Sequence, residues 1–130
     1  MNFFQRRKIL KQVNFLDLTP VRMMEYDVLE NGRIDILLPR FKKTITRNLF
    51  QPRSKGPLIR IHLDVAGTAI WQIIDGQQTV QQLCDRMRSE KPELMNPPEE
   101  TEKRVTDFLS LLYRERYITF REITDVHRNT

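Results

Sequence analysis

The 130-residue chain has few of the residue types on which catalytic and metal sites depend. It contains one cysteine, Cys84, and two histidines, His62 and His127, which lie 65 positions apart. One cysteine excludes an internal disulfide framework and is typical of a reducing compartment. These three residues do not have the spacing of a zinc site. Four glycines, none of them clustered, provide no phosphate-cradling loop. We therefore expect neither an enzyme nor a bound metal or cofactor.

Long hydrophobic runs are also absent. The longest, such as 36–38, are far too short to span a bilayer, and the apolar start at 1–4 leads directly into the basic stretch 5–8. Hydrophobic residues make up 39% and charged residues 30%, which is typical of one globular domain of this length. The sequence predicts a cytoplasmic protein with no membrane partner.

Positive charge is concentrated in the first half of the chain. The net charge is +5, and residues 1–60 contain 13 basic and 5 acidic side chains. Residues 40–60 contain no acid and seven bases: Arg40, Lys42, Lys43, Arg47, Arg53, Lys55 and Arg60. Two interpretations stay open, a solvated loop held apart by mutual repulsion and a surface that contacts an anionic partner.

The first half of the sequence predicts mainly strands. An amphipathic helix is expected over 2–16, followed by a break that ends at Pro20. Alternating apolar residues over 26–28 and 34–38 flank Asn31-Gly32, which predicts a hairpin with a two-residue turn. Pro39 should end its second strand, and a third strand should begin at Leu58 after the basic connection 40–57.

Helical periodicity replaces the alternation from Asp64 onward. The first helix should carry the stripe Ala66, Ala69, Ile70, Ile73 and Ile74 and end at Asp75-Gly76. The second should begin with a capping box, Thr79 and Gln82, and bury Val80, Leu83, Cys84 and Met87. A third helix opened by Pro98 should bury Val105, Phe108, Leu109 and Leu112, and an extended run should follow at 117–120.

This order predicts an α+β protein, a winged helix-turn-helix with a three-stranded antiparallel sheet followed by three helices. The expected organisation is a basic N-terminal extension (1–22), a winged-helix domain (23–123) with the basic insertion 40–57, and a polar tail (124–130). Three aspartates, Asp64, Asp75 and Asp85, fit a helix cap, a helix stop and a solvated face. Trp71 and Cys84 fit core positions.

The segment 63–120 resembles a known family. It reads Leu63-Asp64-Val65-Ala66-Gly67-Thr68-Ala69-Ile70-Trp71, then Ile74-Asp75-Gly76 and Thr79-Val80-Gln81-Gln82-Leu83, then Val105-Thr106-Asp107-Phe108-Leu109-Ser110-Leu111-Leu112 and Tyr117-Ile118. This spacing is similar to that of the PqqD-like family, the coenzyme PQQ synthesis protein D group. With the upstream strands, the similarity extends over about residues 25 to 120.

The resemblance implies a non-enzymatic peptide chaperone, a recognition element for ribosomally made precursor peptides. Such a protein binds the leader of a precursor peptide and presents it to a modifying enzyme, often of the radical S-adenosylmethionine type. The leader adds as a strand to the third predicted strand and packs beside the third helix. Carried over by position, the peptide-binding residues are Leu58, Ile59, Arg60, Ile61 and His62 on the strand, and Arg104, Phe108, Leu111 and Leu112 on the helix.

Two of these residue assignments have alternatives. Arg60 can either contact an acidic leader residue or guard the strand edge against aggregation. Phe108 and Leu112 can either belong to the core or line the peptide cleft. The extra N-terminal residues and the long basic loop depart from the family pattern, and the role of the N-terminal segment in a homodimer stays open.

Two functions of other classes compete with peptide binding. A winged-helix DNA-binding protein would place its third helix in the major groove. Residues 98–115 contain five acids and three bases, and DNA phosphates would repel this net negative charge. We therefore expect no specific nucleic-acid partner. The other rival is a scaffold subunit of a larger complex without chaperone activity.

Overall fold

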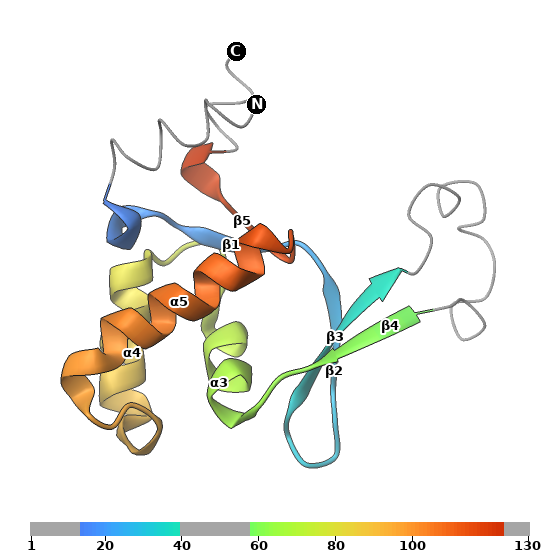
Figure 1. The fold of residues 1–130 in the computed structure, drawn as a ribbon, viewed down its shortest axis with the longest axis horizontal. Coiled ribbons are helices and arrows are strands. Elements are labelled where there is room, and N and C mark those ends of the chain that lie inside the picture. Colours follow the sequence, from blue (N-terminus) through green and yellow to red (C-terminus); the bar gives the residue numbers. More distant parts are fainter. Residues whose placement is uncertain (1–13, 40–57, 124–130) are drawn as a thin grey trace. The chain divides into compact units, whose positions relative to one another are not determined.

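The computed structural model of the protein describes residues 14–39 and 58–123 (Figure 1). These residues form two compact units, which are described separately. One unit comprises residues 24–65, and the other contains the described residues 14–23 and 66–123. The expected helix over 2–16, the basic insertion 40–57 and the tail 124–130 lie wholly or mostly outside the described residues.

The unit of residues 24–65 is built on a three-stranded antiparallel sheet. Its strands are β2 (Glu25–Val28), β3 (Ile34–Pro39) and β4 (Leu58–His62), and β3 lies in the centre. The register pairs Tyr26 with Ile36 and Ile36 with Ile61, so these apolar side chains share one face. Ile34 and Ile36 on this face are fully buried. The sheet confirms the three expected strands, including the end of β3 at Pro39.

The turn between β2 and β3 differs from the predicted two-residue turn. The Leu29 and Gly32 N–H groups donate to Arg33 O and Leu29 O, both at 2.8 Å, which leaves a three-residue loop. Of the two turn residues only Gly32 has a positive φ, +86°, since Asn31 instead accepts the Arg33 N–H on its side chain. The Asn31 side-chain bond therefore selects a longer turn with glycine in the left-handed position.

The other unit is mainly helical. Its elements are η1 (Phe15–Asp17), α3 (Val65–Ile73, whose first residue belongs to the sheet unit), α4 (Val80–Glu90), η3 (Pro92–Leu94), η4 (Pro98–Glu100) and α5 (Thr101–Arg114). Trp71, Leu83 and Leu109 are fully buried. With the sheet, these helices confirm the α+β class.

The second predicted helix is confirmed in detail. In α4 the Thr79 side chain accepts the Gln82 N–H at 3.2 Å, and the Gln82 side chain accepts the Thr79 N–H at 2.8 Å. This capping box satisfies two of the N–H groups that a helix start leaves without partners. The predicted stripe Val80, Leu83, Cys84 and Met87 is the buried set. Gly76 after α3 has φ +76°, as its position after the helix stop predicts.

A second, two-stranded sheet was not predicted. β1 (Pro20–Arg22) pairs antiparallel with β5 (Ile118–Phe120). Leu18, which precedes β1, is buried and its carbonyl accepts the Val80 N–H at 2.9 Å. A three-residue strand whose first residue is a proline is too short for alternation to indicate it. Its partner, β5, coincides with the extended run predicted near residue 118.

Two core predictions on the helices were wrong. Ile73 and Phe108 are partly exposed, although both belong to predicted apolar stripes. On α5 the buried stripe consists of Thr101, Val105, Leu109 and Leu112. These positions follow the spacing of a helix face, and Phe108 lies at the border of that face.

The α5 register can be tested with two leucines that differ only in burial. Leu109 is fully buried, and Leu111 is 43% exposed. We predict that Leu109→Ala lowers the free energy of unfolding by about 2–5 kcal/mol, because it leaves a cavity. Leu111→Ala should cost less than about 1 kcal/mol. Urea unfolding measures both, and equal losses would contradict this register.

Candidate functional site

Among the described residues, one edge of β4 has no strand partner. β4 is the end strand of its sheet, and within the described residues it pairs only with β3. The Leu63 N–H, which follows β4, donates to Ile34 O at 2.9 Å. In antiparallel pairs, main-chain groups alternate between facing the partner strand and facing away. The N–H groups of Ile59 and Ile61 therefore face β3, whereas Leu58, Arg60 and His62 direct their N–H and C=O groups outward.

The two side-chain faces of β4 differ in chemistry. One face carries Ile59 and Ile61, and the other carries Leu58, Arg60 and His62. Leu58 and Ile59 are both 41% exposed. Within residues 14–39 and 58–123, the strand therefore combines main-chain groups that have no partner strand with accessible apolar side chains. All five β4 residues that the sequence predicted for peptide binding lie together on this edge.

A buried carboxylate organises the polar face. The Asp35 side chain, on the central strand β3, is only 3% exposed. Its Oδ1 lies 2.5 Å from Nδ1 of His62, and its Oδ2 accepts from Nη1 of Arg60 at 3.1 Å. Arg60 also forms an ion pair with Asp27 on β2, with Nη2 and Oδ2 at 2.9 Å. Four charged or titratable side chains from three strands thus form one cluster.

These contacts change the acidity of the cluster. The bond from His62, assisted by that from Arg60, lowers the pKa of Asp35 below its usual value of 3.8. The bonds to Asp35 and Asp27 raise the pKa of the Arg60 guanidinium. Because the guanidinium is shared between two carboxylates, its charge is compensated within the sheet. The sequence analysis did not identify Asp27 and Asp35 as members of a cluster. The available signal was Asp35 itself, because a charged residue stands there between Ile34 and Ile36 of a predicted strand.

The α5 residues predicted for peptide binding differ in exposure. Arg104 is exposed and donates to Leu94 O at 3.2 Å. Leu111 is exposed, Phe108 is partly exposed, and Leu112 is buried in the core. A line of accessible side chains therefore runs along α5 through Arg104, Phe108 and Leu111.

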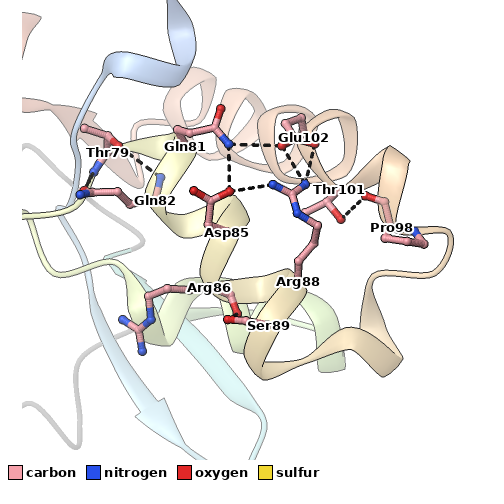
Figure 2. A network of polar contacts seen from close by, with 10 residues as sticks. All are labelled: Thr79, Gln81, Gln82, Asp85, Arg86, Arg88, Ser89, Pro98, Thr101 and Glu102. Carbon is pink, nitrogen blue, oxygen red and sulfur yellow. Dashed lines mark hydrogen bonds and ion pairs between the residues drawn. The ribbon is translucent and has the colours of Figure 1, made fainter.

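A polar network ties α4 to α5 within their unit (Figure 2). Arg88 on α4 forms ion pairs at 2.7 Å with both Asp85 and Glu102, and Glu102 belongs to α5. Gln81 donates to the same two carboxylates at 3.1 and 3.3 Å. The carboxylate of Glu102 on α5 is therefore partly neutralised by Arg88 of α4.

The described residues contain no arrangement for metal chemistry. Within 14–39 and 58–123, no three His, Cys, Asp or Glu side chains gather closely enough to hold a metal ion. No helix in those ranges has the length and hydrophobicity to cross a membrane. Cys84 is buried, and its burial raises the pKa of the thiol to about 11. Its environment thus favours the neutral, unreactive thiol.

One family model matches part of the chain. Residues 58–118 match the family model described as coenzyme PQQ synthesis protein D (PqqD). This segment is PqqD-like. The match begins at the first residue of β4 and continues through the three helices to the start of β5, whereas the hairpin of β2 and β3 lies outside it. PqqD proteins are accessory, non-catalytic binding proteins of a biosynthetic pathway. No curated protein and no solved structure matches the chain.

The acidity of Asp35 provides a test of the cluster. We predict that the Asp35 carboxyl titrates below 3.8 in the folded protein, and that His62→Ala raises its pKa, because the largest stabilising contact of the carboxylate is lost. Since the pKa is lowered by folding, this carboxylate stabilises the protein above about pH 3.8 and loses that effect as the pH falls through the folded-state pKa. Carbon-detected NMR of the Asp35 side chain measures the titration.

A control variant makes this test specific. Lys103→Ala removes an exposed ion pair with Asp107 on α5 and should leave the titration of Asp35 unchanged. A wild-type pKa at or above 3.8 would contradict the cluster geometry.

Proposed function

We propose that the protein is a non-enzymatic peptide chaperone that binds the leader of a ribosomally made precursor peptide through the free edge of β4. It then presents the peptide to a modifying enzyme, of the radical S-adenosylmethionine type that the family resemblance implies. The observation that carries this proposal is the coincidence of two independent findings. The PqqD-like segment begins at β4, and β4 has an outward main-chain edge with accessible apolar side chains.

The chemistry of an open strand edge supports this role. An extended peptide can pair with the outward N–H and C=O groups of Leu58, Arg60 and His62, so affinity comes mainly from main-chain bonds. Alternate peptide side chains then meet Ile59 and Ile61 on one face, which favours apolar residues there. We further propose, from the family resemblance alone, that the fold is a winged helix and that Arg104, Phe108 and Leu111 of α5 take part in peptide binding.

Proline substitutions test the main-chain contact. We predict that His62→Pro weakens peptide binding by about tenfold or more, because it removes an outward N–H and adds ring atoms at the edge. His62→Ala is the matched control, since it removes the same side chain and keeps the N–H. Peptides selected from a displayed library of random sequences of about ten residues serve as ligands, and fluorescence anisotropy measures affinity.

The comparison of the two substitutions decides the outcome. Circular dichroism must show that both variants keep the fold, because either substitution removes a partner of Asp35. Ile61→Pro should instead unfold the sheet, since the Ile61 N–H faces β3. Equal binding by folded His62→Pro and His62→Ala would contradict pairing at this edge. Salt-resistant binding to one defined DNA duplex would favour the DNA-binding alternative.

A further inference from the structure

Arg60 is poorly placed to select a charged ligand. Both terminal nitrogens of its guanidinium are engaged, one by Asp35 at 3.1 Å and one by Asp27 at 2.9 Å. With these three side chains alone, the local charge is already negative. An acidic peptide residue would have to displace one of two existing carboxylates to reach Arg60. Any preference for acidic ligands must therefore come from another cation near β4.

Arg33 is such a cation. The hairpin turn fixes its backbone: its N–H donates to Asn31 Oδ1 at 2.9 Å, and its carbonyl accepts the Leu29 N–H at 2.8 Å. Its Nε is buried, and no acceptor among the described residues bonds to it. No described carboxylate forms an ion pair with its guanidinium. A buried donor without a partner is costly unless something else satisfies it.

Arg33 lies beside the end of the peptide-binding edge. It lines an open hollow of about 380 Å³ together with Asp35, His62 and Asp64. Asp35 has both oxygens engaged, by His62 and by Arg60, and Asp64 is exposed. The hollow therefore contains one guanidinium, that of Arg33, for which no ion pair is recorded within the described residues, and the exposed Asp64 beside it.

We propose that Arg33 binds an aspartate or glutamate side chain of the peptide that pairs with β4. This inference rests on the proposed function. A strand added beside β4 carries every second side chain onto the face of His62, and this histidine also lines the hollow. A guanidinium matches a carboxylate with two parallel hydrogen bonds, which gives geometric selectivity as well as affinity. The expected ligand is thus an extended peptide with apolar side chains on one face. It has one acidic residue near the end of β4 at which His62 lies.

Peptide selection with the full-length protein tests this inference. The probe is a displayed library of random peptides of about ten residues, sorted in parallel against the wild type, Arg33→Met and Arg114→Met. Arg114 is an exposed arginine on α5 and serves as the control for loss of one positive charge. The wild type and Arg114→Met should select peptides with an acidic residue at one fixed position, and Arg33→Met should lose that preference but still select peptides.

A double-mutant cycle on one selected peptide quantifies the contact. Replacing its acidic residue with the corresponding amide should weaken binding to the wild type by about tenfold and leave binding to Arg33→Met unchanged. If the selected peptides bind the β4 edge but share no acidic position, the proposed role of Arg33 is wrong and the proposed function still stands. If no protein selects any peptide, the proposed function fails, and the role of Arg33 fails with it.

Discussion

The negative charge of Asp35, buried on the central strand, is the constraint on which the edge strand depends. A buried carboxylate is tolerated only when it is paired and hydrogen-bonded. Here the partners are Arg60 and His62, both on β4, and Arg60 also binds Asp27 on β2. These contacts hold three strands in one register. They also direct the Arg60 guanidinium toward the sheet, so that the outward main-chain groups of β4 stay accessible.

If β4 binds a peptide as we propose, this arrangement separates two requirements of such a strand. Main-chain bonding requires a straight, accessible edge, and selectivity requires side chains that read the ligand. The contacts of Asp35 fix the position of β4, whereas Ile59 and Ile61 form an apolar surface. Arg33, whose buried Nε has no hydrogen-bond partner among the described residues, is the side chain that we propose selects the ligand. In the helical unit, the ion pair between Arg88 and Glu102 likewise joins two elements, α4 and α5.

Sequence patterns predicted the elements that depend on local signals. The capping box of α4, the glycine after α3 and the start of β4 at Leu58 were all predicted, because each depends on residues close together in the chain. The β1–β5 sheet was missed, since pairing of residues 20–22 with 118–120 is a long-range event between short strands. The Asp35 cluster was missed for the same reason: it joins three strands, and only the register brings Asp27, Asp35 and Arg60 together.

The most direct test of the central claim is amide hydrogen exchange of β4, with and without a bound peptide. In the free protein, the N–H groups of Ile59 and Ile61 should be protected by β3, whereas those of Arg60 and His62 should exchange quickly. Peptide binding by strand addition should protect Arg60 and His62 specifically. If a peptide binds tightly while these two amides still exchange as in the free protein, the β4 edge is not the binding site.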